Sequence, residues 1–329
     1  MFERIFKLSE HKTTVKTEVM AGITTFMTMA YILAVNPSVL GSTGMDTTAV
    51  LLATALASCL GTLCMAFMAN LPFALSAGMG LNAFMAYTVV AGYGYSWQVA
   101  LLAVFIEGLI FIVLSLTNVR EAIFNAIPLT LKKGVSVGIG LFIAFIGLQN
   151  SGLCVDSATL VGIISFPENF HTAGICALLT LIGLFFTAVF YTRKMKGAIL
   201  YGILLTWILG MLCQVTGLYV PTPDAGFYSL FPSWGMTDFS KLGLTFGQCF
   251  NVDFSAVGIV NFIVVIFSFL FVDIFDTLGT LIGVATKAKM LDKDGKLPGI
   301  KPALLADSIA TSAGAILGTS TTTTFVESA

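Results

Sequence analysis

The sequence predicts an all-α polytopic membrane protein, on the strength of its composition and of apolar runs that recur along the whole chain. Of its 329 residues, 57% are hydrophobic and only 10% are charged. An ordinary globular sequence is about one quarter charged, so a soluble domain of this size could not bury so much apolar surface. Several runs reach the roughly 20 apolar residues that a helix needs to cross a bilayer. The composition therefore favours a chain embedded in lipid over a soluble enzyme with a large core.

Ten segments are candidate membrane spans. In chain order they are residues 19–40, 48–69, a broken segment 72–90, 97–116, 134–148, 173–191, 197–218, 257–286, 303–317, and a last run that starts near Thr319. Residues 118–131 are predicted to form a short surface helix between the fourth and fifth spans. The first run is longer than the core of a signal peptide and lacks a clear cleavage site, so it is predicted to be a retained span.

The distribution of lysine and arginine supports this segmentation. Fifteen of the sixteen basic residues fall on one side of the predicted membrane, and only Lys241 falls on the other. The positive-inside rule assigns the basic side to the cytoplasm, which places the N-terminus there. Adding or removing a span before residue 287 would scramble this bias. The sequence thus predicts a multi-pass protein of the plasma membrane with a cytoplasmic N-terminus.

Two candidate spans are irregular, and they occupy matching places. Residues 71–82 contain a proline and two glycines, and residues 317–327 contain a glycine followed by six hydroxyl residues. Threonine favours extended backbone, so each segment is predicted to form a short strand that turns into a half-helix. Extended backbone at membrane depth is buried in protein or lines a cavity. Interrupted spans in matching positions of two halves point to the substrate site of a transporter.

The spacing of the irregular segments predicts the domain organisation. Seven spans separate the third from the tenth, which indicates a seven-plus-seven inverted repeat. Residues 1–218 would form the first repeat, with core and gate elements, and residues 219–256 an extracytoplasmic loop. Residues 257–329 would form an incomplete second repeat. Because the sequence stops two residues into the last half-helix, we expect a fragment that is truncated after the start of the tenth span.

Acidic residues inside an apolar run mark the predicted site. Asp273 lies near the middle of the eighth span, and Asp276 lies about one turn further on. A carboxylate at a helix centre costs about 2.5–3.5 kcal/mol on insertion scales. Residues three apart share one helical face, about 4.5 Å apart along the axis, and Thr277 extends the same polar stripe. This stripe is expected to face a polar cavity that binds a ligand; the alternative is an interhelical hydrogen-bond network.

The irregular segments supply further candidates. Glu327 starts the last half-helix, whose free N–H groups suit a ligand carbonyl or ring nitrogen, while its carboxylate would accept from ligand N–H groups. Asn82 takes the equivalent place in the third span. Purely structural roles, a helix cap for Glu327 and a packing amide for Asn82, are the alternatives. Phe325 could stack on a planar ligand.

Two other acids are expected to be structural. Glu107 is predicted to bond to a neighbouring span, and Asp307, near the start of the ninth span, to act as a cap or a gate residue. The six cysteines form no CxxC pair and both histidines lie outside the apolar runs, so neither a disulfide framework, a metal site nor a cofactor is predicted. The net charge of −1 gives no reason to expect nucleic acid as a partner.

Four separated motifs resemble a known family of permeases. They are residues 21–37 (AGITTFMTMAYILAVNP), 76–84 (SAGMGLNAF), 271–280 (FVDIFDTLGT) and 319–329 (TSTTTTFVESA). In these motifs the chain resembles the AzgA-like adenine/guanine/hypoxanthine permeases, a branch of the nucleobase–cation symporter-2 (xanthine/uracil permease) family. The resemblance runs from the N-terminus to the last residue.

The resemblance implies fourteen spans in two inverted repeats, arranged as a core and a gate, and import of purine nucleobases by proton symport. It implies that Asp273 and Glu327 bind the purine, with Asn82 and Asp276 involved in binding or transport. The predicted proton-coupling residues are also Asp273 and Glu327. The full predicted substrate-binding set is Asp273, Glu327, Asn82, Asp276, Thr277, Val326 and Phe325. The expected partners are a purine base, the proton and the lipid bilayer; a homodimer is compatible with the sequence, which does not fix an oligomeric state.

Two alternatives stay open at this point. A carrier of the same architecture could move uracil, xanthine or an anion, although several acids facing the cavity disfavour an anion. An intramembrane aspartyl protease also has buried acids. It needs two aspartates that face each other from different helices, whereas Asp273 and Asp276 share one helix and no GxGD sequence occurs.

Overall fold

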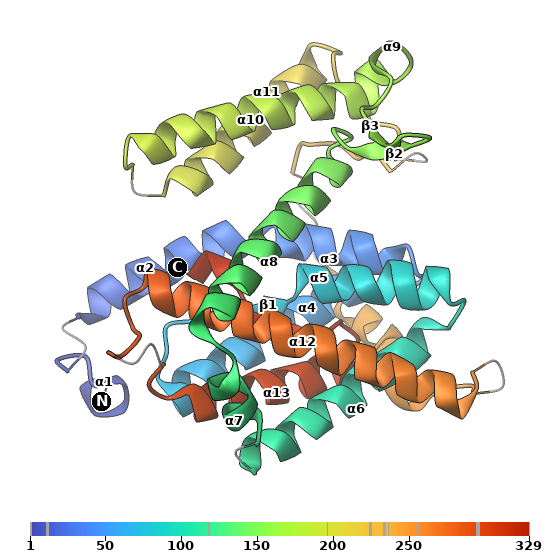
Figure 1. Ribbon diagram of the computed structural model, residues 1–329. Coiled ribbons are helices and arrows are strands. Elements are labelled where there is room, and N and C mark those ends of the chain that lie inside the picture. Colours follow the sequence, from blue (N-terminus) through green and yellow to red (C-terminus); the bar gives the residue numbers. More distant parts are fainter. Residues whose placement is uncertain are drawn as a thin grey trace. The chain divides into compact units, whose positions relative to one another are not determined.

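The chain is described by a computed structural model that covers residues 2–10, 13–117, 119–195, 197–223, 226–232, 235, 237–254, 257–293 and 297–328. Its contacts gather into two compact units. Unit 1 consists of Met1–Gly140 and Thr237–Ala329, and unit 2 of Leu141–Met236. Figure 1 shows the course of the chain, coloured from the N-terminus in blue to the C-terminus in red.

The predicted spans are largely confirmed. Among the described residues, seven helical segments are long and apolar enough to cross a membrane, and they match predicted spans one, two, four and six to nine: Val15–Gly41, Thr47–Ala69, Trp97–Leu116, Phe166–Thr192, Ala198–Val215, Ile259–Lys287 and Ile300–Leu317. Shorter apolar helices at Met79–Gly92 and Val137–Asn150 correspond to the third and fifth. The chain is therefore a polytopic membrane protein.

The first half of unit 1 contains the elements of the first four spans. Its helices are α1 (Phe2–Phe6), α2 (Val15–Met29), α3 (Ile32–Gly41), α4 (Thr47–Cys64), α5 (Met79–Ala83), α6 (Trp97–Leu116) and α7 (Val119–Ala126), with π-helical turns at Met65–Ala69 and Phe84–Gly92. The first span is broken between α2 and α3, at Ala30 and Tyr31. At this break the Tyr31 side chain reaches Glu327.

The second half of unit 1 begins with two 3₁₀ helices, Phe239–Leu244 and Gln248–Phe250, which interrupt the predicted loop 219–256. Helices α12 (Ile259–Lys287) and α13 (Ile300–Leu317) follow, and a 3₁₀ turn at Val326–Ser328 ends the described chain. Helix α13 packs closely against α4 and α6. A Cβ atom added at Gly61 would lie 2.8 Å from the Cβ of Ala310, and one added at Gly108 would collide with Ser312. Small residues therefore let three backbones approach one another around α13.

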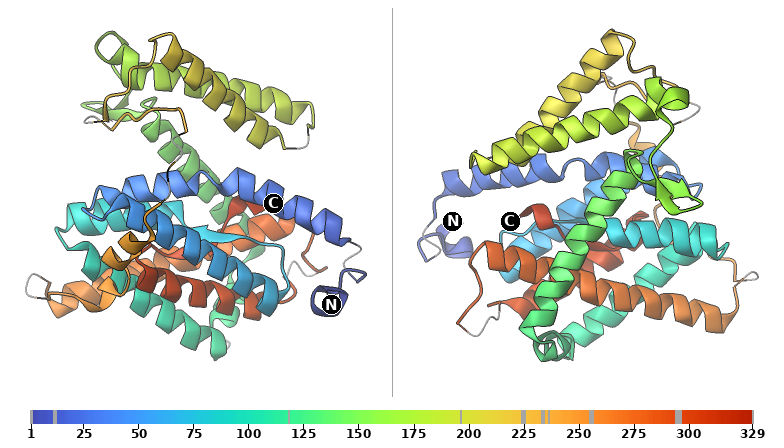
Figure 2. Two further views of the ribbon diagram at one scale, coloured as in Figure 1. Left: turned by 180° about the vertical axis from the view of Figure 1, so that it is seen from behind. Right: turned by 45° about the horizontal axis from the view of Figure 1, so that its top comes forward.

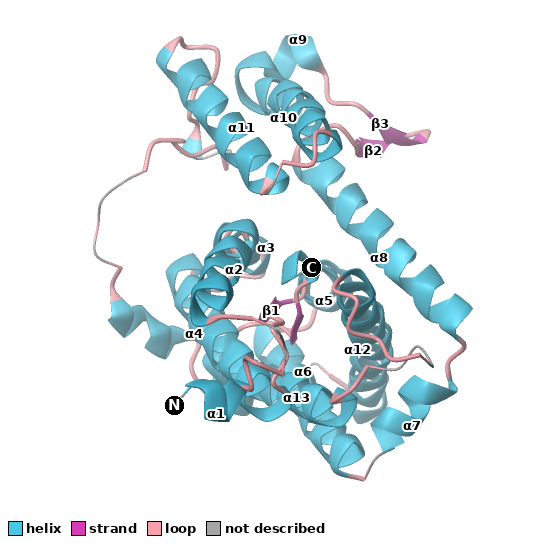
Figure 3. Ribbon diagram, turned by 90° about the vertical axis from the view of Figure 1, so that its left-hand side faces the viewer, coloured by secondary structure: helices cyan, strands magenta, loops and turns pink. Residues whose placement is uncertain are grey.

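Both irregular segments contain the predicted extended piece. Strand β1 (Leu75–Ala77) pairs antiparallel with β4 (Thr322–Thr324), with Ser76 opposite Thr323. The pairing continues past the strands, because the Gly78 N–H donates to the Thr321 carbonyl (3.0 Å) and the Phe325 N–H to the Ala74 carbonyl (2.8 Å). All six strand residues are buried. Figure 3 shows β1 enclosed by the helices of this unit.

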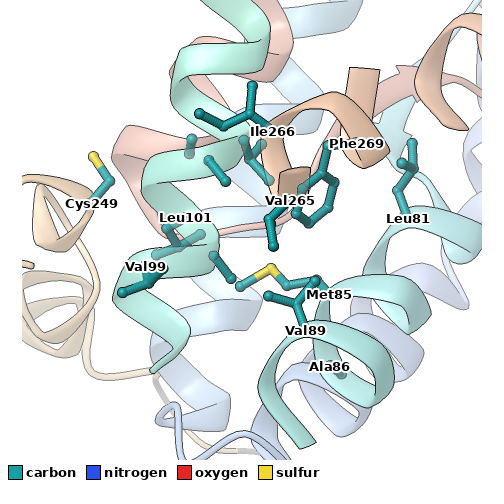
Figure 4. Close-up of a cluster of buried hydrophobic side chains, with 14 of the residues drawn as sticks. Leu81, Met85, Ala86, Val89, Val99, Leu101, Cys249, Val265, Ile266 and Phe269 are labelled. Carbon is teal, nitrogen blue, oxygen red and sulfur yellow. The ribbon is translucent and has the colours of Figure 1, made fainter. Parts of the chain in front are cut away.

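An apolar cluster lies between the third span and α12. It joins α5 and the π-helical turn behind it to α6 and α12, through residues such as Leu81, Met85, Leu101, Val265 and Phe269. Figure 4 shows these side chains converging between the three elements. Because interiors pack at crystal-like density, the cluster fixes the distance between the third span and α12.

Unit 2 is built on a pair of contacting helices, α10 (Ile175–Thr192) and α11 (Ala198–Val215), which lie side by side in both views of Figure 2. Helix α8 (Leu129–Asn150) starts within the residues of unit 1 and ends within those of unit 2. The connection between the predicted fifth and sixth spans contains a short hairpin of β2 (Val155–Ser157) and β3 (Leu160–Gly162). The helix α9 (Phe166–Asn169) and a π-helical turn at Phe170–Gly174 follow it. The sixth span accordingly begins several residues earlier than predicted.

Candidate functional site

Asp273 is the centre of a buried polar cluster. It lies halfway along α12 with none of its surface exposed. Its Oδ1 accepts a hydrogen bond from the Thr277 hydroxyl (3.2 Å), one turn further on, and its Oδ2 accepts from Nη2 of Arg120 (3.4 Å). Thr277 is equally buried, and its hydroxyl also lies 3.5 Å from that of Thr323 in β4. The polar stripe predicted on the eighth span thus faces the strand pair.

Arg120 enters this cluster from α7, where a surface helix was predicted. The helix is found at Val119–Ala126, but the Arg120 side chain is only 4% exposed, so the prediction of a surface position is wrong for this residue. Its guanidinium forms ion pairs with Asp307 (2.9 Å) and Asp273 (3.4 Å). Its carbon Cζ lies 4.0 Å from the centre of the Phe111 ring. An aromatic face is a favourable site for a desolvated cation.

Asp307 is the second acid held by Arg120. The sequence suggested a cap or a gate residue, but α13 begins at Ile300, so Asp307 lies about two turns inside the helix and cannot be its cap. It is fully buried, and its Oδ2 accepts from Arg120 and from the Thr277 hydroxyl (3.2 Å). Arg120 therefore bridges acids from two different helices.

Asp276 lies beside the turn that follows β1. An added Cβ atom at Gly78 would lie 3.6 Å from Oδ2 of Asp276 and 2.9 Å from Cγ2 of Thr323. Gly78 separates β1 from α5. A side chain at this position would fill the space between the acid and β4, which gives a steric reason for the glycine in the third span.

Glu327 lies just beyond the C-terminal end of β4. Its Oε1 accepts a hydrogen bond from the Tyr31 hydroxyl at 2.6 Å, and the ring of Tyr31 lies 6.1 Å from that of Phe325. Phe325 is buried at 5% exposure, whereas Val326 is 41% exposed. Phe325 packs in a small apolar cluster with Met29 and Ile32, so its ring forms part of the support for β4.

Asn82 takes part in a hydrogen-bond network between spans. Its amide Nδ2 donates to Oδ1 of Asn36 (3.0 Å), and the Asn36 amide donates to the hydroxyls of Thr54 and Thr319, both at 2.8 Å. All of these residues are buried. The network ties α5 to α3, to α4 and to Thr319, the first of the six hydroxyl residues of the tenth segment.

Glu107 contacts the tenth segment from α6. It is fully buried, and its Oε2 accepts from the Thr321 hydroxyl (3.3 Å). Within the described part of the chain, its Oε1 and Oδ1 of Asp307 have no hydrogen-bond partner. The predicted bond to a neighbouring span is therefore present, and a second buried oxygen is left over.

The predicted site residues fall into three groups around the paired strands β1 and β4. Asp273, Asp276 and Thr277 lie toward Thr323, Glu327 lies with Tyr31 beyond the end of β4, and Asn82 lies in the network of Asn36. Among the described residues, no hydrogen bond joins Asp273 to Glu327. The sequence did not point to Arg120, Tyr31 or Asn36 as contributors to these groups, and it pointed to Asp307 only as a cap or gate residue.

These features define a class of protein. Buried acids face two broken spans whose strands pair inside a helical membrane protein, and polar groups at membrane depth mark substrate or ion pathways. Arg120 lies between Asp273 and Asp307, so these two acids do not form the proton-sharing pair of an aspartic protease. The arrangement is that of a membrane transport protein.

Comparison with known proteins identifies the family. Residues 16–329 match the Permease family. A permease of Methanocaldococcus jannaschii is 47% identical over 99% of this chain and 70% of its own length. The guanine/hypoxanthine permease PbuO of Bacillus subtilis is 43% identical over 98% of this chain and 71% of its own. The adenine permease AdeP of Escherichia coli is 41% identical over 100% of this chain and 69% of its own. The chain belongs to the Permease family, whose members are transporters rather than enzymes, and the resemblance to adenine/guanine/hypoxanthine permeases is confirmed.

Proposed function

We propose that this protein imports purine nucleobases (adenine, guanine and hypoxanthine) by secondary active proton symport. The names of its relatives support a nucleobase as the substrate, because PbuO is a guanine/hypoxanthine permease and AdeP an adenine permease. The observation that carries the proposal is that two acids, Asp273 and Glu327, lie near the buried strand β4. Thr277, which donates to Asp273, lies 3.5 Å from the hydroxyl of Thr323, and Glu327 lies just beyond the strand, where it accepts from Tyr31.

A purine would bind against the β1–β4 pair, with Asp273 and Glu327 accepting its N–H groups. Asp276 and Asn82 would contribute from α12 and α5, while Thr277, Phe325 and Val326 would shape the surrounding wall. Such a site rejects bases that lack the matching N–H groups, because its own buried polar atoms would then be left unpaired. In this arrangement Glu327 is oriented for the ligand by the Tyr31 hydroxyl.

Proton coupling would operate through Asp273, with Glu327 as the second candidate. An ionised acid buried at membrane depth is unfavourable, so we propose that Asp273 carries a proton when the site is loaded and loses it on the inner side. A membrane potential would add about 2.3 kcal/mol per charge per 100 mV. The inward gradient of protons would thereby drive purine accumulation.

The wider architecture is part of the same proposal. Spans one to seven would be the first of two inverted repeats, divided into a core and a gate, with residues 219–256 as an extracytoplasmic loop and residues 257–329 in the second repeat. The pairing of β1 with β4 supports this relation between the third and tenth segments. The separation of Leu141–Met236 as its own unit supports a gate made of the later spans of the repeat. The basic residues support a cytoplasmic N-terminus in the plasma membrane.

Competition of labelled hypoxanthine uptake tests the substrate. The full-length protein is expressed in cells that lack their own purine carriers, and unlabelled adenine, guanine, xanthine, uracil and sulfate are each added. We expect competition by adenine and guanine. Competition by uracil, xanthine or sulfate instead would assign the protein to the alternative classes of cargo.

Asp273→Asn tests the site. We expect it to abolish uptake while the protein still reaches the membrane, because the variant keeps the shape of the side chain and loses the titratable acceptor. Asp156→Asn, in the exposed hairpin strand β2, is the matched control and should transport normally. Uptake unchanged in Asp273→Asn would contradict the assignment.

A further inference from the structure

We propose that Arg120 is the counter-charge of ionised Asp273 in the unloaded carrier, and that it is a positioning residue for the return of the empty carrier across the membrane. The proposal rests on the proposed purine–proton symport and concerns one step of that cycle. It assigns a role to a residue that lies outside every predicted span.

The guanidinium of Arg120 is buried and hydrogen-bonded. Arg120 is 4% exposed, and its contacts come from α6, α12 and α13 as well as its own helix. On α13 it donates from Nη1 to the Leu304 carbonyl (2.9 Å) and the Ser308 hydroxyl (2.6 Å), and from Nη2 to Asp307 (2.9 Å). A cation that has lost its water needs this degree of pairing to be tolerated.

The contacts of Arg120 are unequal in length. The three bonds to α13 measure 2.6–2.9 Å, whereas both contacts to α12, to Asp273 and Thr277, measure 3.4 Å. Hydrogen bonds to charged groups are strongest near 2.7–2.9 Å. Arg120 is therefore anchored to α13, and Asp273 is the partner that it can release.

The Thr277 hydroxyl lies 3.2 Å from Oδ1 of Asp273 and 3.2 Å from Oδ2 of Asp307. A hydroxyl has one proton and can donate to one of these acceptors at a time. When Asp273 is ionised, it competes for this proton; when it is protonated or bound to a ligand, Thr277 is free to donate to Asp307. The acceptor of the Thr277 hydroxyl, and with it the hydrogen bonding of Asp307, thus depends on whether Asp273 is ionised.

Among the described residues, the charged groups around Asp273 are mostly acidic. The titratable groups on the elements packed about it are Asp276 on the same helix, Glu107 on α6, Asp307 on α13 and Glu327 on the turn after β4, and among the described residues Arg120 is the cation that contacts it. Arg120 with Asp307 is a neutral pair. Protonated Asp273 leaves this pair undisturbed, whereas ionised Asp273 depends on Arg120 for its contact with a positive charge within the described part of the chain.

The consequence is a difference between two transport modes. Exchange of internal for external purine moves only the loaded carrier, in which Asp273 is neutral or occupied by the ligand. Net uptake also needs the empty carrier to return with Asp273 ionised. If Arg120 balances that charge, its removal should impair net uptake and spare exchange; a merely structural role would impair both equally.

The test uses the full-length protein in proteoliposomes with labelled hypoxanthine. For Arg120→Gln we expect net uptake driven by a pH gradient to fall at least tenfold, while exchange stays within about threefold of wild type with an unchanged KM. Arg120→Lys, which keeps the charge, should restore net uptake to within about threefold. Loss of both modes in a folded Arg120→Gln, or loss of net uptake in a folded Arg120→Lys, would overturn the proposal.

A charge-balanced variant covers the case in which Arg120→Gln fails to fold because Asp307 is left unpaired. Arg120→Gln with Asp307→Asn removes the anchoring ion pair as a unit. We expect this double variant to exchange and still to lack net uptake, because Asp273 has no counter-charge. Recovery of net uptake would show that Arg120 serves only Asp307 and would refute the role. Wild-type vesicles that show neither mode would refute the proposed function itself, which keeps the two failures distinguishable.

Discussion

Two helix pairs of this protein, α10 with α11 and α12 with α13, contain threonines that play different roles. In unit 2, Gly183 faces Thr206 and Gly202 faces Thr187 across the contact of α10 and α11. Both threonines donate to a carbonyl of their own helix four residues back, each at 2.7 Å. In unit 1, by contrast, the Thr277 hydroxyl of α12 is aimed at acids of two helices.

The difference shows what a hydroxyl group inside the membrane is for. A threonine that bonds to its own backbone is satisfied before the helices meet, so in unit 2 it serves close packing through its shape. A threonine between two carboxylates can donate to either of them, so in unit 1 the Thr277 hydroxyl can respond to the protonation of Asp273. The residue type is the same in both places, and the charges around it decide the role.

The largest expected effect comes from removing the hydroxyl at constant shape. Thr277→Val should lower purine uptake by between about tenfold and a hundredfold, because a hydrogen bond to a charged group is worth about 1.5–3 kcal/mol. Thr206→Val should leave uptake within about twofold. Initial uptake rates per molecule at the cell surface measure both, and equal losses in the two variants would contradict the comparison.

A change at the contact of α10 and α11 should disturb helix packing and leave purine binding unaffected. A Cβ atom at residue 202 would lie 2.9 Å from the Cβ of Thr187 and closer still to its hydroxyl oxygen. Gly202→Ala should therefore cost about 1–3 kcal/mol of stability through overpacking and lower the thermal midpoint of the purified protein. The KM for purine should not change.

A second-site change checks the cause of that loss. Thr187→Ala removes the colliding oxygen and methyl group, so the double variant should regain part of the stability lost in Gly202→Ala. A double variant as unstable as the sum of the two single changes would mean that the helices are not in contact at this pair.

The same comparison explains which parts of the site could be predicted from the sequence. Asp273 and Asp276 stood out because a carboxylate within a long apolar run is anomalous in any structure of that run. The extended segments at β1 and β4 followed from local propensity, since glycine, proline and a run of threonines are poor helix formers. Such features depend on neighbours in the sequence.

Arg120 could not be predicted in this way. It follows the fourth span in a polar stretch, where an arginine is normally counted as a cytoplasmic surface charge. Its burial depends on α7 packing against α12 and α13, more than 150 residues away in the chain. Asp307 was misjudged because its helix starts at Ile300, three residues before the predicted span. Tyr31 and Asn36 lie in a quoted motif, but their partners Glu327 and Thr319 are nearly 300 residues distant.

A smaller effect is expected at the other end of β4. Tyr31→Phe removes the hydroxyl that donates to Glu327 at 2.6 Å and leaves the ring contact with Phe325. Glu327 is partly exposed, so water can replace part of the bond, and we expect the KM for purine to rise by about tenfold or less, since each 1.4 kcal/mol is a factor of ten. A change confined to kcat would place Tyr31 in carrier movement instead of ligand binding.

The smallest effect is expected at an ion pair that is not buried. Asp46 caps α4 by accepting from the Ala49 N–H (2.9 Å), and Lys241 lies 3.2 Å from its other oxygen. The Ala49 hydrogen bond, with a lesser contribution from Lys241, holds the pKa of Asp46 below its ordinary value. The stabilisation is therefore complete above the ordinary pKa of about 3.9 and is lost as the pH falls through the lowered folded value.

Asp46→Ala should accordingly lower stability by about 1 kcal/mol at pH 7, the usual value of a helix cap, and by less as the pH is lowered below 4. Asp46→Asn keeps the cap and loses only the charge pairing, which is worth about 0–1 kcal/mol at the surface. Denaturation of the purified protein at both pH values measures the two changes. If Asp46→Asn were as destabilising as Asp46→Ala, the exposed pair would be acting through its charge, as the buried pair of Arg120 and Asp307 does. Burial would then not explain the difference between the two ion pairs.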